Sequence, residues 1–163
     1  MKKSLIAKIV GLGGSVLALL IMLVTKVTFK VSATVAGMSQ SMDQKFKFMD
    51  VITNKENAFD DMTCRTIVLF AFILVILAVL YFAASVVLEV MGKKLPVAQA
   101  DLIGAGVIVF AAVLLVVAQF FAKKESEMGY TLKVAIQTLS YIGTYVTLLA
   151  GVGAGAAAVV LKD

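Results

Sequence analysis

Four long stretches of this chain contain no Asp, Glu, Lys or Arg, and they limit its fold more than any other feature. They are residues 9–25, 66–88, 102–122 and 134–161, of 17, 23, 21 and 28 residues. A helix needs about 20 apolar residues to cross the hydrocarbon core of a bilayer. Within that core every backbone amide must be hydrogen-bonded inside the protein, which excludes open strands. We therefore expect an all-α integral membrane protein with four transmembrane helices.

The composition agrees with this expectation. The 163 residues are 61% hydrophobic and 15% charged, with a mean hydropathy of +1.03, whereas soluble domains are closer to half apolar and a quarter charged. The first stretch is short, but Lys8 and Lys26 have long stems that can reach the membrane interface. We predict a single four-span domain over 1–163. Its spans are 4–25, 62–91, 101–122 and 133–161, and its extramembrane loop is 26–61.

The loop of roughly 40 residues after the first span carries two different hydrophobic periods. Residues 27–35 alternate between apolar and polar side chains, which is typical of a half-buried strand. Beyond Gly37 the apolar residues recur every three or four positions, which indicates an amphipathic helix and a surface for a partner. These residues are Met38, Met42, Phe46, Met49 and Ile52. A short strand followed by a helix, and one helix continuous with the first span, both fit the pattern.

Small residues form a stripe along the last span. Gly143, Thr147, Gly151 and Gly155 follow one another at intervals of four, which places them on one face of a helix. Such a face lets another helix approach backbone to backbone. Gly11 and Ser15 give the first span a similar side. We expect these six positions to be helix-packing sites.

Few polar groups lie within the predicted spans. Glu89 stands four residues before Lys93, so it fits either an interfacial ion pair or a carboxylate facing a cavity. Gln119 and Gln137 lie near span ends, where they would bond across helices or be wetted. The chain has no histidine and one cysteine, Cys64. We expect no catalytic, cofactor-binding or metal-binding residues, no cofactor, and no enzymatic activity.

The charges indicate how the chain meets the membrane. The net charge is +5, and the basic residues fall at span ends and in loops, where anchoring explains them. We therefore expect a lipid bilayer as partner and no nucleic acid. Lys2 and Lys3 before an apolar run resemble the start of a bacterial signal sequence. We predict an uncleaved first span in a bacterial-type plasma membrane, with both termini in the cytoplasm.

The order of segments is similar to that of claudin-like tetraspan proteins. Both have a short tail, a long first loop after an alternating segment, a brief middle turn and a short last loop. The tryptophan-containing signature and the paired cysteines of that family's first loop are missing here. The similarity therefore concerns architecture alone and implies no residue roles.

A chain with packing motifs but no reactive groups indicates a structural function. Our leading hypothesis is a structural or pore-lining subunit of an oligomeric membrane assembly, with helices packed through the glycine stripe. The alternatives are a monomeric accessory or immunity-type protein that binds another membrane protein or a toxin, and a small transporter that depends on Glu89.

Overall fold

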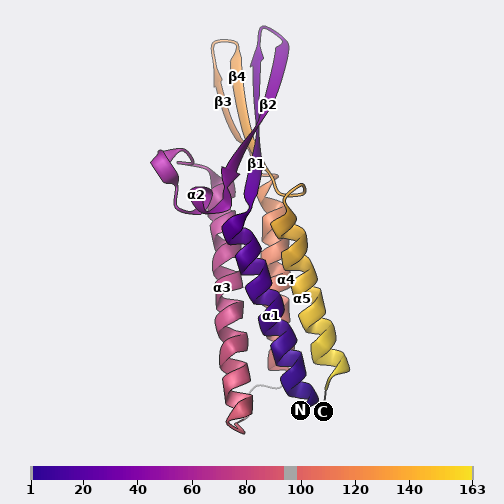
Figure 1. Cartoon of the computed structure of the whole chain (residues 1–163). Helices are drawn as coiled ribbons and strands as arrows, with labels where there is room; N and C mark the ends of the chain where they lie inside the picture. Colours follow the sequence, from indigo (N-terminus) through magenta and orange to yellow (C-terminus); the bar gives the residue numbers. More distant parts are fainter. Residues whose placement is uncertain (1, 94–98, 163) are drawn as a thin grey trace.

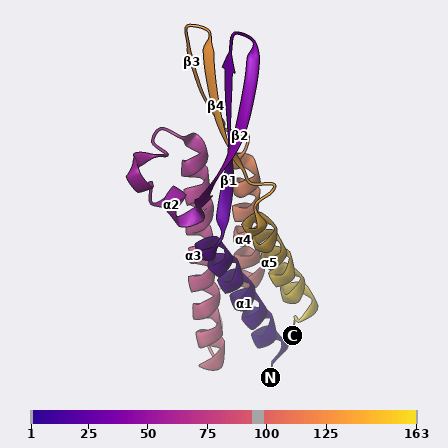
Figure 2. The ribbon, with the colours of Figure 1, turned by 45° about the horizontal axis from the view of Figure 1, so that its top comes forward.

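The computed structural model describes residues 2–93 and 99–162. Four long helices form a bundle, and an antiparallel sheet projects from the end of the bundle opposite the two termini (Figure 1). The long helices are α1 (Lys3–Val24), α3 (Thr63–Val90), α4 (Ala100–Ala118) and α5 (Ile142–Val160). A short helix α2 (Phe48–Ile52) and a 3-10 turn η1 (Lys55–Asn57) lead into α3 and lie to one side of the sheet (Figure 2).

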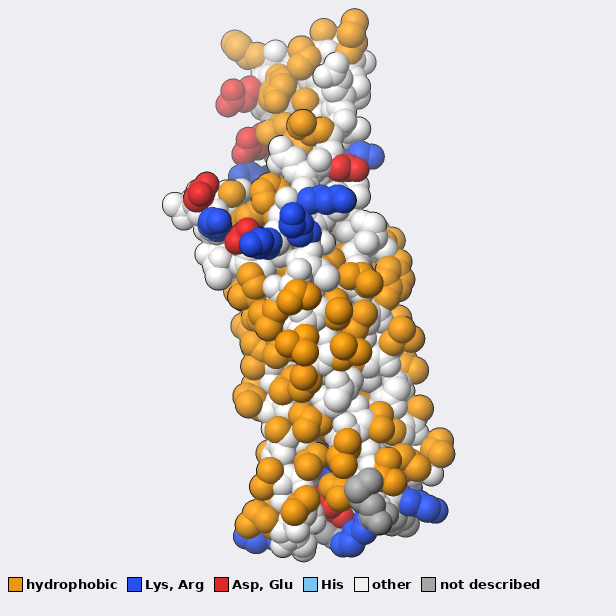
Figure 3. Space-filling view, viewed as in Figure 1, with side chains coloured by type: hydrophobic (Ala, Val, Ile, Leu, Met, Phe, Trp, Pro, Cys, Tyr) orange, Lys and Arg blue, Asp and Glu red, His pale blue; other side chains and the backbone are white. Residues whose placement is uncertain are grey.

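The long helices are apolar along most of their length. Among the described residues these four helices are long and apolar enough to cross a membrane. In the space-filling view, hydrophobic side chains cover the middle of the bundle, and charged side chains gather at its two ends (Figure 3). The helices pack in the order α1, α3, α4, α5 and back to α1. Fully buried side chains such as Val75, Ile108 and Leu115 fill the interior between them, so the described bundle is a packed core.

The prediction of an all-α protein is wrong, because the sheet is a substantial element. Its strands are β1 (Lys26–Val35), β2 (Met38–Lys47), β3 (Lys123–Glu127) and β4 (Tyr130–Gln137), in the order β2-β1-β4-β3. Neighbouring strands are antiparallel, and β1 pairs with β2 over its full length. The strand predicted at 27–35 is therefore one of the two inner strands of a four-stranded sheet instead of a short isolated one.

The amphipathic helix expected after Gly37 is largely a strand. Met38, Met42 and Phe46 are separated by four residues, a spacing that suits one face of a helix and also, being even, one face of a strand. All three lie in β2 and its register with β1 is continuous. Met49 and Ile52 break the even spacing and lie in α2. The alternative of one helix continuous with the first span is also wrong, because β1 begins two residues after α1 ends.

The last uncharged stretch also divides into a strand and a helix. Its first residues, to Gln137, belong to β4, and α5 begins only at Ile142. The stretch is 28 residues long, well above the roughly 20 that a span requires. Its excess length accommodates the strand, in which Leu132, Val134 and Ile136 face one side.

Two-residue turns close both hairpins. Ala36 and Gly37 connect β1 to β2 with φ of 48° and 82°, and Met128 and Gly129 connect β3 to β4 with φ of 36° and 84°. Positive φ at both central positions is the geometry of a type I′ turn, whose twist matches that of paired strands. The hairpins are therefore tight, and the sheet ends in two narrow tips.

Aromatic side chains and one arginine join the sheet to the bundle. Phe48 stacks on Tyr141 with ring centroids 5.5 Å apart, and Phe29 packs against Phe59 at 5.3 Å. Arg65, on the first turn of α3, donates hydrogen bonds to the carbonyl oxygens of Val51 (3.0 Å) and Ile52 (2.9 Å). Those carbonyls lie at the end of α2, where a cation is favourable, so the short helix is held against the bundle.

Candidate functional site

The glycine stripe of the last helix is used inside the molecule. Gly151 is buried against α4, and a Cβ there would lie 2.7 Å from Val109 Cγ2 and 2.9 Å from Val109 N. Gly155 faces Ala105 of the same helix, with 3.6 Å from its Cβ position to Ala105 Cβ. Thr147 is fully buried and its hydroxyl donates to Gly143 O at 2.7 Å. This face therefore packs α5 against α4 of the same chain.

The small residues of the first helix are likewise covered by neighbouring helices. A Cβ on Gly11 would collide with the ring of Phe82 in α3, and a Cβ on Gly14 would lie 3.3 Å from Ala150 Cβ in α5. Ser15 is fully buried and donates to Leu12 O at 3.0 Å. The close contacts at α1 are thus intramolecular as well.

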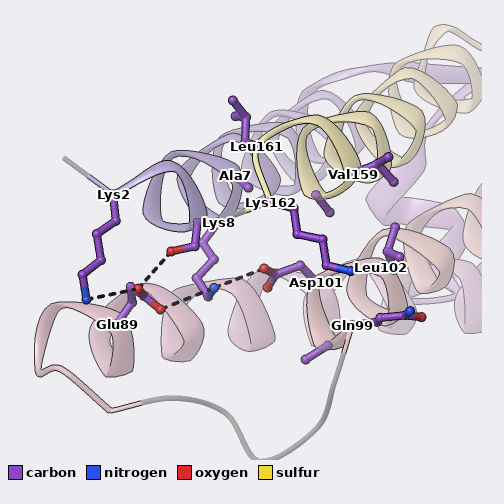
Figure 4. Close-up of a pocket in the computed structure, with 13 residues that line it drawn as sticks. Lys2, Ala7, Lys8, Glu89, Gln99, Asp101, Leu102, Val159, Leu161 and Lys162 are labelled. Carbon is purple, nitrogen blue, oxygen red and sulfur yellow. Dashed lines mark hydrogen bonds and ion pairs between the residues drawn. The ribbon is translucent and has the colours of Figure 1, made fainter.

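A buried ionic cluster lies at the end of the bundle that carries the termini (Figure 4). Lys8 Nζ is 3.1 Å from Asp101 Oδ2 and 3.6 Å from Glu89 Oε2. The side chains of Lys8 and Glu89 are only 11% and 9% exposed. Ser4 donates to Glu89 Oε1 at 3.0 Å, and the exposed Lys2 lies 4.0 Å from the same oxygen. Three helices therefore each contribute one charged side chain to a single cluster.

The cluster lines a pocket of about 670 Å³. Carbon atoms of Leu102, Val159 and Leu161 form its apolar wall beside the charged groups. Asp101 Oδ1 is buried and has no hydrogen-bond partner in the described part of the chain. The exposed Lys2 and Lys162 also line the pocket, so its two carboxylates lie among three lysines.

Sequence reasoning found one of the three central charges. It selects Glu89, either in an ion pair with Lys93 or facing a cavity. In the structure Glu89 lines the pocket, and its ion pairs are with Lys2 and Lys8. The sequence predicts Lys8 to be an interfacial anchor and does not identify Asp101 as a site residue. The positions of the three charged residues near helix ends were a signal that they could meet. In an antiparallel bundle the start of α1, the end of α3 and the start of α4 all lie at the same end.

The two selected glutamines lie apart from this cluster. Gln119 follows the last residue of α4 and is partly buried. Gln137 is the last residue of β4, and its backbone carbonyl accepts a hydrogen bond from Ser140 Oγ at 3.1 Å. Gln137 is paired with Thr28 in the sheet, so it is not part of a long helix.

The sheet presents two different surfaces. We call the side of the sheet that carries Phe29 the apolar face, after its apolar residues Val31, Ala33, Val35, Met38, Met42, Phe46, Tyr130, Leu132 and Val134. The register also places Gln40, Gln44, Lys123, Glu125 and Glu127 on this side, mostly along the outer strands β2 and β3. Near the bundle this face is covered, and Phe46 and Phe59 line a groove of about 220 Å³ there. Toward the tips it opens, with Met38 79% and Met42 59% exposed.

The predicted partner surface is therefore divided. Met38 and Met42 are exposed on the outer half of the apolar face, while Met49 is partly buried and Ile52 is buried in the junction with the bundle. The opposite side of the sheet is the basic face. It carries Lys26, Lys30, Lys45, Lys47, Lys124 and Lys133, all exposed.

No family model matches the chain, and no curated protein matches it. Within residues 2–93 and 99–162 there is no group of three or more His, Cys, Asp or Glu residues placed to hold a metal ion. That the protein is not an enzyme and uses no cofactor stays a prediction.

Proposed function

We propose that the protein is a structural subunit of an oligomeric integral membrane assembly. In this proposal the four helices span the bilayer, and the sheet makes the contacts between subunits outside it. The observation that carries the proposal is the exposed outer half of the apolar face, with Met38 and Met42 at 79% and 59% exposure. Exposed apolar patches on a rigid support are typical of protein–protein contact sites.

The edges of the sheet support the same function. β2 and β3 are the outer strands in the order β2-β1-β4-β3, so each has one backbone edge that pairs with no other strand among the described residues. Such an edge is a template for pairing with another chain. β2 is ten residues long, which is enough for a specific contact.

In this proposal the helix bundle anchors each subunit in the membrane. Its glycine faces are covered within the chain, and its interior is filled by buried side chains. A pore, if the assembly encloses one, would therefore lie between subunits.

The mass of the intact complex in mild detergent tests the proposal. We expect the wild type to run as a multiple of the 17.3 kDa chain, and Met38→Asp/Met42→Asp to run as the monomer. The control is Ser39→Asp/Ser41→Asp, which places the same charges on the same strand but on the other face. A wild-type monomer at all concentrations would overturn the proposal. A complex with one different protein would favour the accessory-protein alternative.

The ionic cluster favours a second candidate, a small transporter. Buried carboxylates beside a pocket are typical of ion pathways. Reconstituted vesicles loaded with a pH-sensitive dye test this function: Glu89→Gln should abolish proton or cation flux without reducing expression. Vesicles that show no flux above protein-free controls would rule it out.

A further inference from the structure

The basic face of the sheet concentrates positive charge, with six lysines against one acidic residue. Six lysines lie on it, and Asp43 is the acidic residue that the register places among them. Asp43 is opposite Lys30, but none of the six lysines forms an ion pair with another described residue. The ion pair found within the sheet joins Lys123 and Glu125, which lie on the opposite face.

Two pairs of these lysines are placed directly against each other. Lys26 is opposite Lys47 across β1 and β2, and Lys124 is opposite Lys133 across β3 and β4. Like charges in directly opposed positions destabilise a sheet. The arrangement therefore lowers the stability of the free protein, and an anion bound between the lysines would relieve the repulsion.

The other side chains on this face indicate what kind of anion fits. They are Thr28, Ser32, Thr34, Ser39, Ser41, Ser126, Thr131, Ala135 and Gln137. Protein interface cores are depleted in lysine and serine and enriched in aromatic residues and arginine. Aromatic side chains, which stack on the bases of single-stranded nucleic acid, are absent from the face. Lysines surrounded by hydroxyl groups instead suit a hydrated chain of repeated anionic groups, because each lysine is a point charge without a fixed fork.

The dimensions distinguish such a chain from the lipid surface. Lys26 begins β1 immediately beyond the bundle, and the row containing Lys133 and Lys124 is level with Ser32, six residues further along β1. At about 3.3 Å per residue this row lies roughly 20 Å beyond Lys26. The headgroup layer adds only about 5 to 8 Å to each side of a bilayer core, so headgroups would reach the rows of Lys26 and Lys45 but not the row of Lys124 and Lys133.

We propose that the basic face binds a linear polyanion, a hydrated polymer with repeated phosphate or carboxylate groups, that lies along the sheet outside the membrane. The bound chain bridges lysines from both hairpins. It is separate from the contact between subunits, which uses the apolar face.

Inorganic polyphosphate, titrated onto the full-length protein in nanodiscs of uncharged lipid, tests the proposal. With about four lysines engaged, affinity should fall roughly 50-fold between 50 and 200 mM salt, because bound counterions are released on binding. Lys124→Gln/Lys133→Gln should weaken binding and reduce the salt dependence by about half, while Lys124→Arg/Lys133→Arg should retain both.

Lys123→Gln is the matched control, since Lys123 is adjacent in sequence but lies on the other face. It should leave the affinity unchanged. Equal loss in this control, equal binding to uncharged dextran, binding that requires anionic lipid in the nanodisc, or tighter binding to single-stranded DNA would each overturn the proposal. So would co-purification of an acidic protein that competes with polyphosphate. Because these readouts measure polyanion affinity, they stand or fall independently of the oligomer mass that tests the proposed function.

Discussion

At the end of the bundle that carries the termini, Lys8 is buried and paired with two carboxylates. At the other end of the molecule, the lysines of the basic face are exposed and without ion pairs among the described residues. A buried charge must be compensated inside the fold, because it cannot be solvated. An exposed lysine placed against another lysine stabilises nothing within the chain. The comparison therefore separates charges that maintain the fold from charges available to a partner.

The largest expected effect comes from removing the buried cation. Lys8→Met leaves the Glu89 and Asp101 carboxylates facing each other, and loss of one member of a buried pair costs about 3 to 5 kcal/mol. We expect this loss in the free energy of unfolding measured in detergent micelles. Lys8→Met combined with Glu89→Gln and Asp101→Asn should recover most of it. Lys2→Met is the control, because Lys2 is 65% exposed; an equal loss there would contradict the distinction between the two ends.

The next effect concerns the close contact between α5 and α4 within the bundle. Gly151→Leu would force a side chain against the backbone of α4 at Val109 N, 2.9 Å from the Cβ position. Overpacking of this kind costs typically 1 to 3 kcal/mol. Gly153→Leu is a matched control, two residues away in the same helix, where a Cβ meets nothing within 4 Å. Equal thermal stability of the two variants would show that α5 does not depend on close approach to α4.

The bundle could be anticipated from the sequence because its signal is local. The absence of charge over 66–88 and 102–122 marks helices that the structure places at Thr63–Val90 and Ala100–Ala118. The sheet could not be anticipated in the same way. The even spacing of Met38, Met42 and Phe46 suits a helix and a strand equally, and an uncharged stretch does not reveal where a strand ends and a span begins.

The sites were predictable only where a single helix carries the information. Spacing identified the face that contains Gly151, but it does not tell whether the helix opposite belongs to the same chain. The ionic cluster depends on Lys8, Glu89 and Asp101. Lys8 and Glu89 are more than 80 positions apart in the sequence. Their meeting is a consequence of tertiary packing. The basic face likewise emerges only once β1 is paired with β4.

A pH-dependent effect is expected where the sheet joins the bundle. Burial raises the pKa of Tyr141 to about 12 from 10.0, and its hydroxyl lies 3.0 Å from Thr25 Oγ1. Between pH 10 and 12 the unfolded chain loses the phenolic proton while the folded chain keeps it. Stability therefore falls as pH rises through this window, by roughly 1 kcal/mol per pH unit.

Unfolding free energies at pH 9.5 and 11.5 measure this dependence. Tyr141→Phe should remove its share of the slope, whereas Tyr145→Phe, at a position 50% exposed, should keep it. Lysine titration is common to both variants and cancels in the difference. Identical slopes would mean that the phenol of Tyr141 is not shielded from water in the folded protein.

The smallest effect distinguishes the two faces of the sheet, because its sign differs between the neighbouring residues Lys123 and Lys124. Lys124→Glu replaces a like-charged pair with Lys133 by an opposite pair, which should stabilise the sheet by about 0.2 to 1 kcal/mol. Lys123→Glu instead breaks the 3.2 Å ion pair with Glu125 and should lower stability by a few tenths of a kcal/mol. Polyphosphate affinity should fall clearly in Lys124→Glu and much less in Lys123→Glu. A stabilised Lys124→Glu that no longer binds polyanion would establish that the lysine pair is kept at the expense of the fold. A destabilised Lys124→Glu would mean that the repulsion is already relieved within the free protein.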